Sequence, residues 1–364
     1  MDRTAAALAL ATQLTRDGRL QEATQLIQQA LGMGRERQEA PPSYPQARTE
    51  SDFIDVPCRE VFDTPPLTGP AHHHAPRPRG ESFTAHVFAH GGHRWRYRLY
   101  EPARIDPAIL LPVVVMLHGC KQDAEDFARG TAMNEVAARE GVLVLYPEQL
   151  RKANQMGCWN WFDPQHQKRD GGEPAMIAAL VQSVVATHGG DPRRVYVAGL
   201  SAGGAMAATL GDLYPDVFAA VGVHSGLPAR AAHDVPSAFS AMRRGASQAA
   251  AHRTAAIPTI VFHGTADKTV APGNADAVLQ RQVHAHRAAG TTLIPLESPG
   301  AHGAHSRRAT RVQWRDSEGT TVLESWSIAG APHAWSGGHA GGSFTDPQGP
   351  SASEAMMAFF LHRK

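Results

Sequence analysis

The chain has 364 residues, 42% of them hydrophobic and 19% charged, with 34 glycines and 26 prolines. These values are typical of a globular protein with a sizeable core and many turns, built as one large domain or as a domain with a small appendage. The formal net charge of +1, without a long run of arginine or lysine, argues against a nucleic-acid-binding surface.

The first residues make a poor secretory signal. Asp2 is acidic, and the apolar run that follows is soon broken by Gln13 and Arg16. The sequence contains no stretch of 18 apolar residues, so we expect no membrane span. We therefore expect a cytoplasmic protein, although a chain trimmed of its signal would look the same, so that a secreted or periplasmic location stays open.

Residues 1–37 carry two runs of leucine and alanine at helical spacing and predict a pair of helices. Such a pair buries little by itself, so we expect it to dock on the main domain or to contact an oligomer mate or a polymer granule. Residues 38–81 are rich in proline, arginine and histidine and predict a flexible linker. The three adjacent histidines at 72–74 are more often incidental than ligands in such a linker, and we expect no metal and no cofactor.

Residues 82–364 alternate between strand and helix patterns. Two alternating strands come first, and apolar runs follow that are typical of interior parallel strands, with helical spacing between them. The pattern predicts a doubly wound, mostly parallel α/β sheet with two antiparallel strands at its start, a hairpin over 312–328 and a closing helix. Residues 225–256 fit neither period and are either a cap over the site or a plain surface excursion. The predicted strands are 83–89, 95–100, 111–117, 142–146, 195–198, 219–223 and 257–262, and the predicted helices are 127–139, 176–188, 275–289 and 353–362.

The sequence Gly199-Leu200-Ser201-Ala202-Gly203 lies between a buried strand and a helix of small residues. This is the pattern of a nucleophile elbow, in which a strand turns directly into a helix and needs small residues on both sides of the serine. A bare Gly-x-Ser-x-Gly arises by chance fairly often, but the flanking strand and helix favour the functional interpretation. We predict that Ser201 is the nucleophile and that the N–H of Ala202 is one donor to an oxyanion.

A neutral serine needs a base held by a carboxylate, and in this fold the partners follow in the order Ser, then Asp or Glu, then His. Asp267 follows a buried strand directly, whereas Asp212, Asp216 and Asp276 fall on helices or their ends, where a solvated charge is the simpler account. His333 comes between the last strand and the final helix, with His339 as its nearest rival in a Gly-rich stretch. We predict Asp267 as the acid and His333 as the base.

The second oxyanion donor should come from the loop after the third strand, where the N–H of Cys120 is well placed. Trp159, Trp161 and Trp335 are candidates for an apolar substrate slot, with core packing as the alternative. The position of Trp335, two residues from His333, favours the site for this tryptophan.

Cys58, Cys120 and Cys158 are too few for a disulfide framework. Cys120 and Cys158 could form a disulfide, but a reducing cytosol argues against this bridge. No pair of cysteines has the spacing of metal ligands.

With these residues in place, the sequence resembles the esterases of the polyhydroxybutyrate depolymerase family, which are α/β-hydrolases with a Ser-Asp-His triad. The resemblance spans roughly residues 96–361 and rests on the stretches 117–120, 157–162, 194–204, 263–267 and 333–335. It implies an α/β-hydrolase fold, the same four roles for Ser201, Asp267, His333 and Cys120, and a close approach of Cys120 to Cys158.

Two features differ from secreted members of that family, namely the lack of a convincing signal peptide and of a carboxyl-terminal substrate-binding domain. We therefore expect an intracellular serine esterase that hydrolyses polyhydroxyalkanoate-type polyester, its oligomers or another small ester through an acyl-enzyme. The alternatives are a feruloyl or acetylxylan type of carbohydrate esterase, and a non-catalytic protein that coats polymer granules.

Overall fold

The structure is a computed structural model that describes residues 80–104, 106, 108–246, 254–299 and 307–362. Contacts divide the chain into residues 1–75 and 76–364, and the described residues all belong to the second unit. The helical pair predicted at 1–37 and all but the last two residues of the predicted linker at 38–81 lie outside the described residues.

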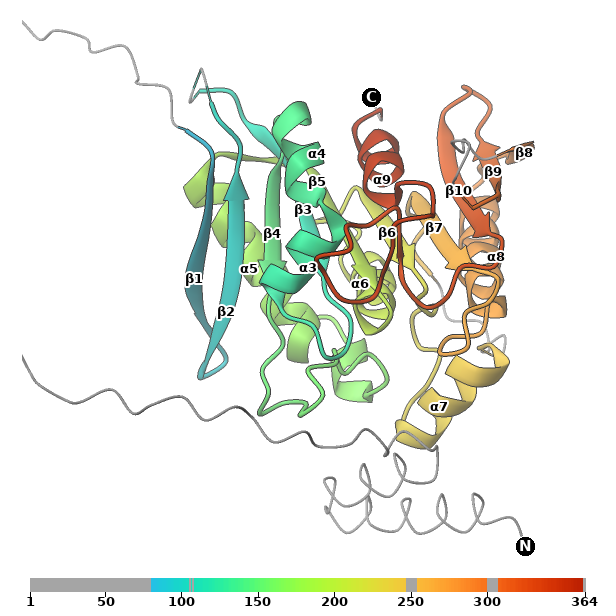
Figure 1. Ribbon diagram of the computed structural model, residues 1–364, viewed down its shortest axis with the longest axis horizontal. Coiled ribbons are helices and arrows are strands. Elements are labelled where there is room, and N and C mark those ends of the chain that lie inside the picture. Colours follow the sequence, from blue (N-terminus) through green and yellow to red (C-terminus); the bar gives the residue numbers. More distant parts are fainter. Residues whose placement is uncertain (1–79, 105, 107, 247–253, 300–306, 363–364) are drawn as a thin grey trace, which may run out of the picture. The chain divides into compact units, whose positions relative to one another are not determined.

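A ten-stranded sheet with the order β1-β2-β4-β3-β5-β6-β7-β10-β9-β8 runs through this unit (Figure 1). The six strands from β4 to β10 in that order pair in parallel, and the strands at both ends pair antiparallel. The predicted mostly parallel sheet with antiparallel strands at its start is therefore confirmed. The strands are β1 Ser82–His90, β2 His93–Glu101, β3 Leu111–Leu117, β4 Leu143–Pro147, β5 Gly190–Leu200, β6 Ala220–His224, β7 Thr259–Gly264, β8 Ile294–Pro299, β9 Ala309–Arg315 and β10 Thr321–Ile328.

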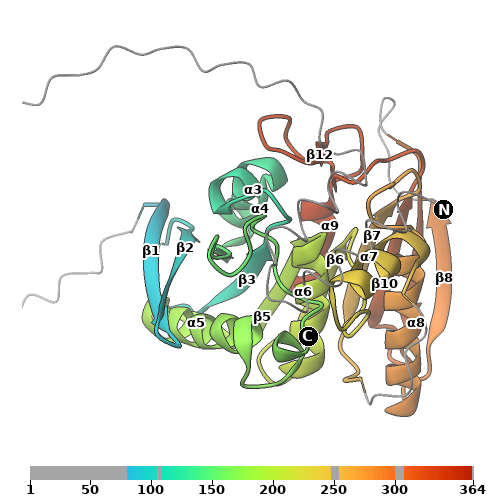
Figure 2. The same ribbon diagram turned by 90° about the horizontal axis from the view of Figure 1, so that it is seen from below.

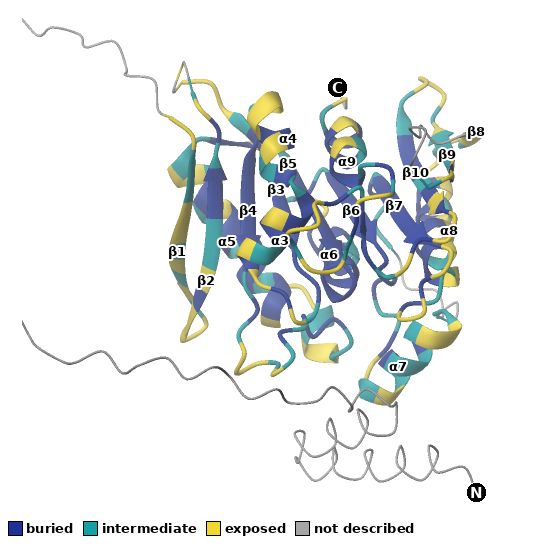
Figure 3. Ribbon diagram, in the orientation of Figure 1, coloured by how far each residue is buried: buried dark blue, intermediate teal, exposed yellow. Residues whose placement is uncertain are grey.

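Helices cover both faces of the sheet (Figure 2). The side chains of β3 show why: Val113, Val115 and Leu117 join the core that contains α5 and α6, whereas Val114 and Met116 join the core that contains α3, α4 and α9. The central strands are accordingly buried on both faces (Figure 3). The helices are α3 Ala124–Thr131, α4 Met133–Glu140, α5 Gly172–His188, α6 Ala202–Leu213, α7 Val235–Arg244, α8 Gly273–Ala288 and α9 Ala352–Leu361, with a 3-10 helix η1 at Pro164–Gln167 and a small pair of strands, β11 Trp335–Ser336 and β12 Thr345–Asp346.

Several elements differ from the sequence predictions. The single helix expected over 127–139 is two helices, because Ala132 adopts a left-handed conformation (φ 51°) that ends α3 and starts α4. Strand β8 was not predicted; Ile294 and Leu296 on this edge strand are exposed, so no buried face marks it. The 225–256 segment contains α7, which begins at a capping box formed by Asp234 and Ser237.

The elbow helix α6 lies directly against the end of β3. A Cβ placed on Gly203 would be 2.0 Å from the carbonyl oxygen of Leu117, and one on Gly199 would be 2.4 Å from the backbone of Gly203. Both glycines are therefore required by close backbone contact, as the elbow pattern indicates.

We expect Gly203→Ala to destabilise the protein by about 2 kcal/mol or more, because a methyl group there must push a backbone carbonyl aside. Gly273→Ala is the matched control, since Gly273 is the first residue of α8 and has no atom within 4 Å of its ideal Cβ. This control should stabilise by about 0.5 kcal/mol through the better helix propensity of alanine. Urea unfolding of both variants measures the difference, and equal stabilities would contradict the packing argument.

Candidate active site

Ser201 lies between the end of β5 and the start of α6, with φ 58° and ψ −118°. A non-glycine residue rarely adopts this conformation, and such strain is concentrated at functional sites. The backbone N–H of Ser201 donates to the carbonyl oxygen of His224 at 2.9 Å, and the residue is 8% exposed. The backbone is thus fixed while part of the residue reaches the surface.

Asp267 and His333 meet at the same edge of the sheet, after β7 and β10. The Nδ1 atom of His333 is 2.7 Å from Oδ2 of Asp267, and the N–H groups of Thr269 and Val270 each donate to Oδ1 at 2.9 Å. Burial alone would raise the pKa of Asp267, but hydrogen bonds from His263 and His333 hold it well below its ordinary value. Asp267 is therefore an anion that fixes the orientation of the His333 ring.

His224 lies beside both Ser201 and His333. Its carbonyl oxygen accepts the N–H of Ser201, and burial, followed by the charges of His263 and His333, lowers the pKa of its ring well below the ordinary value. No hydrogen bond joins the Ser201 hydroxyl to His333 among the described residues. Contacts of this kind are often long in hydrolases without substrate and tighten when it binds.

Two buried histidines around Asp267 were missed by sequence reasoning. The Nε2 atom of His263 is 2.9 Å from the carbonyl oxygen of Val270 and 3.4 Å from Oδ2 of Asp267, so Nε2 carries the hydrogen. The Nε2 atom of His224 instead accepts the N–H of Ser336 at 2.9 Å. The signal available in the sequence was their place at the carboxyl ends of β6 and β7.

The loop that carries Cys120 is held through its neighbours. The N–H of Gly119 donates to Oε1 of Gln122 at 2.9 Å, and the N–H of Lys121 donates to the carbonyl oxygen of Met156 at 2.8 Å. Within the described part of the chain no acceptor engages the N–H of Cys120 between them. This group is therefore available as the predicted oxyanion donor.

The Cys120 loop packs on the elbow. A Cβ on Gly119 would be 3.6 Å from Cβ of Ser201, which is ordinary van der Waals contact. Ala202 is the first residue of α6, where the backbone N–H has no partner within the helix and the helix dipole favours negative charge. Both predicted donors therefore belong to segments that border Ser201.

Cys120 and Cys158 form a disulfide, with 4.2 Å between their Cα atoms. The bridge ties the Cys120 loop to the segment that follows β4. It joins two segments that are 38 residues apart in the sequence.

The three predicted substrate-binding tryptophans require a correction. Trp159, Trp161 and Trp335 are only 0%, 4% and 1% exposed, so they offer almost no surface to a substrate. Trp335 packs between Phe127 and His224 and donates from its indole N–H to Ser353. The alternative interpretation of these side chains, core packing, fits their placement, because large aromatic side chains also fill cores.

Within the described ranges, no three histidine, cysteine, aspartate or glutamate side chains are grouped so that they could hold a metal ion. No helix in those ranges is long and apolar enough to cross a bilayer.

A mostly parallel sheet between two helical layers, with a strained serine at a strand–helix turn and an Asp–His pair at the same edge, defines an α/β-hydrolase. The model of the esterase PHB depolymerase family matches residues 95–292, and the chain belongs to that family.

Relatives similar to this chain include depolymerases and esterases. Poly(3-hydroxyalkanoate) depolymerase C of Paucimonas lemoignei is 32% identical over 234 residues, which are 61% of this chain and 54% of the relative. Feruloyl esterase B of Thermothelomyces thermophilus is 35% identical over 130 residues, 35% of this chain and 43% of that protein. The chain thus spans about half the length of the curated relatives it matches. The acetyl xylan esterase from Aspergillus awamori has the same fold, with a TM-score of 0.54 and 19% identity over 69% of this chain and 94% of the other.

Asp267 should make the stability of the protein depend on pH. Because its folded pKa lies below the unfolded value of about 3.9, its contribution is present above that pH and is lost as the pH falls toward the folded value. We expect the free energy of unfolding of Asp267→Asn to be about 1 to 3 kcal/mol lower than that of the wild type at pH 6. This difference should become smaller between pH 4 and pH 2. Denaturant unfolding across this range measures it.

Asp276→Asn serves as the control, because Asp276 is an exposed residue in the first turn of α8. If the difference in the free energy of unfolding between Asp267→Asn and the wild type stays constant or grows on acidification, hydrogen bonds to Asp267 do not favour its charged form.

Proposed function

We propose that the protein is a serine esterase that hydrolyses polyhydroxyalkanoate-type polyester or its oligomers through an acyl-enzyme. The observation that carries the proposal is the contact between His333 and Asp267 at the sheet edge that also carries the strained Ser201. Membership of the esterase PHB depolymerase family and the similarity to a poly(3-hydroxyalkanoate) depolymerase support the substrate class.

In the proposed reaction, Ser201 attacks the ester carbonyl carbon while His333 takes the hydroxyl proton. The N–H groups of Cys120 and Ala202 donate to the oxyanion, and Asp267 stabilises the imidazolium. Collapse of the tetrahedral intermediate breaks the ester C–O bond, and the leaving alcohol takes the proton from His333. Water, deprotonated by His333, then attacks the acyl carbon. The bond from that carbon to Oγ of Ser201 breaks, Ser201 takes the proton back from His333, and the acid is released.

A carbohydrate esterase is the second candidate, because feruloyl esterase B is 35% identical to part of this chain. Such an enzyme would use the same triad on a feruloyl or acetyl sugar. The third hypothesis, a non-catalytic granule protein, predicts a degenerate site, whereas the three triad side chains are all present in this chain.

The location of the protein stays a prediction. Disulfides persist mainly in oxidising compartments, so the bridge between Cys120 and Cys158 favours a secreted or periplasmic location over the cytoplasmic one expected above. The contacts proposed for the helices at 1–37, with an oligomer mate or a granule, also stay predictions.

We expect Ser201→Ala to lower hydrolysis of a p-nitrophenyl ester and of 3-hydroxybutyrate oligomers by at least about 1000-fold, because the nucleophile is lost. Ser317→Ala, in the exposed turn between β9 and β10, is the control and should keep wild-type rates. Activity that survives in Ser201→Ala would contradict the assignment. Higher kcat/KM for feruloyl or acetyl sugars than for hydroxybutyrate oligomers would favour the carbohydrate esterase, and a wild type that a serine-directed phosphonate fails to label would favour the non-catalytic protein.

A further inference from the structure

A buried carboxylate lies behind the proposed site. Glu173 is the second residue of α5 and is 1% exposed. No lysine or arginine in the described ranges forms an ion pair with it, and Nδ1 of His166 lies 3.7 Å from its Oε2. Burial raises the pKa of this carboxyl group. Placing such a group in a core is costly unless hydrogen bonds compensate for the lost water.

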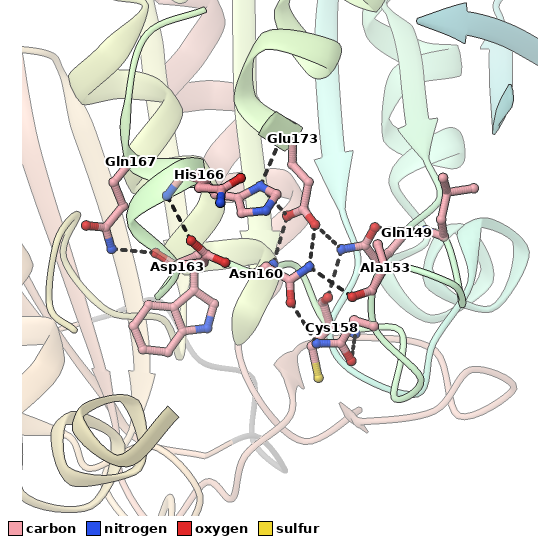
Figure 4. Close-up of polar contacts among 12 residues, drawn as sticks. Gln149, Ala153, Cys158, Asn160, Asp163, His166, Gln167 and Glu173 are labelled. Atoms are coloured by element: carbon pink, nitrogen blue, oxygen red, sulfur yellow. Dashed lines mark hydrogen bonds and ion pairs between the residues drawn. The ribbon is translucent and has the colours of Figure 1, made fainter. Parts of the chain in front are cut away.

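Three N–H donors surround the Glu173 carboxylate (Figure 4). The side chain of Gln149 donates to Oε1 at 2.5 Å, and the side chain of Asn160 donates to the same oxygen at 2.7 Å. The backbone N–H of Asn160 donates to Oε2 at 2.8 Å. All three donors come from the segment between β4 and α5, so the carboxylate holds this segment at two points.

From Gln149 the network reaches the loop of Cys120. The Gln149 side chain also donates to the carbonyl oxygen of Cys158 at 2.9 Å, and Cys158 is bridged to Cys120. The backbone N–H of Gln149 donates to Nε2 of His118 at 3.2 Å, and Nδ1 of His118 donates to the carbonyl oxygen of Gly119 at 2.8 Å. Two connections therefore run from Gln149 to the residues around the Cys120 N–H.

A third connection runs from Asn160. Its Oδ1 accepts the side-chain N–H of Asn154 at 2.9 Å, and Oδ1 of Asn154 accepts the N–H of Met156 at 3.0 Å. The carbonyl oxygen of Met156 in turn accepts the N–H of Lys121. The segment between β4 and α5, which the Glu173 carboxylate fixes, therefore holds the backbone on both sides of Cys120 and also its sulfur.

We propose that Glu173 is a positioning residue for the esterase reaction: through Gln149 and Asn160 it sets the loop in which the Cys120 N–H faces the developing oxyanion. This inference rests on the proposed function. Glu173 does not touch the reacting atoms, and its effect is on the geometry of a donor that acts in the transition state.

The variant Glu173→Gln keeps the volume and replaces one acceptor oxygen with an NH₂ group. Because both oxygens accept N–H groups, either orientation of the amide sets a donor against a donor. Loss of an oxyanion donor costs roughly 100- to 1000-fold in kcat, so a displaced one should cost about 10- to 100-fold. We expect that loss in kcat per phosphonate-labelled Ser201, with KM within about threefold of the wild-type value, since ground-state binding is unchanged.

Glu354→Gln is the matched control, because Glu354 also lies in the first turn of a helix, α9, but is exposed and pairs with Arg139. It should leave kcat and KM unchanged. Counting labelled Ser201 separates the inference from a purely structural role, which would lower the number of active sites but not kcat per site.

Hydrogen exchange tests the positioning without relying on activity. Peptides covering 117–122 and 150–160 should exchange faster in Glu173→Gln than in the wild type, and peptides from β6 and β7 should not. Unchanged exchange at 117–122, or unchanged kcat per labelled Ser201, would overturn the inference. A wild type without esterase activity would overturn the proposed function instead, and the exchange data would still decide whether Glu173 holds the loop.

If Glu173→Gln does not accumulate as folded protein, Gln149→Met provides the same test. It removes the side-chain bonds to Glu173, Cys158 and the N–H of Leu150 but keeps the backbone N–H that His118 accepts. The same split between kcat and KM and faster exchange at 117–122 are expected, and wild-type values for both would overturn the proposal.

Discussion

The backbone contact between the elbow helix and the end of β3 is the constraint on which the site depends. Gly203 lies so close to the carbonyl oxygen of Leu117 that no side chain fits between them. This contact sets the amino end of α6 beside the loop that follows β3, so that a Cβ on Gly119 would be in van der Waals contact with Cβ of Ser201. The strained serine, its helix terminus and the neighbouring N–H groups are consequences of one close approach of two backbones.

Around this contact, burial has opposite effects on the two kinds of titratable group. Asp267 stays charged because two histidines and two backbone N–H groups face it, whereas the buried ring of His224 stays neutral with a backbone N–H on one of its nitrogens. The surroundings therefore place a single negative charge under His333. A positive charge that forms on the His333 ring during a reaction would be stabilised there without the movement of any other group.

Most of the fold could be predicted from the sequence, because interior parallel strands are apolar throughout and the chain order fixes which strand ends meet. Ser201 follows β5 directly, Asp267 and His333 follow β7 and β10 after short loops, and the structure brings Asp267 and His333 into contact. Glu173 could not be found in this way, since Gln149 and Asn160, which donate to it, lie in the irregular segment between β4 and α5 and are brought to it only in the folded chain. His263 carried a signal that was not used, because it lies at the carboxyl end of β7 and only four residues before Asp267. Trp335 was assigned to the substrate slot because it is close to His333 in the sequence. The structure buries it instead, because closeness in sequence does not determine which way a ring points.

Gln122 connects the two sides of the site. Its Oε1 accepts the N–H of Gly119, and its side-chain NH₂ donates to Ser343, in the segment that follows His333. A change of sequence around Ser343 would therefore be transmitted to the loop of Cys120. Sequence variation in the 337–346 segment should then be coupled to turnover, unless Gln122 is allowed to vary with it.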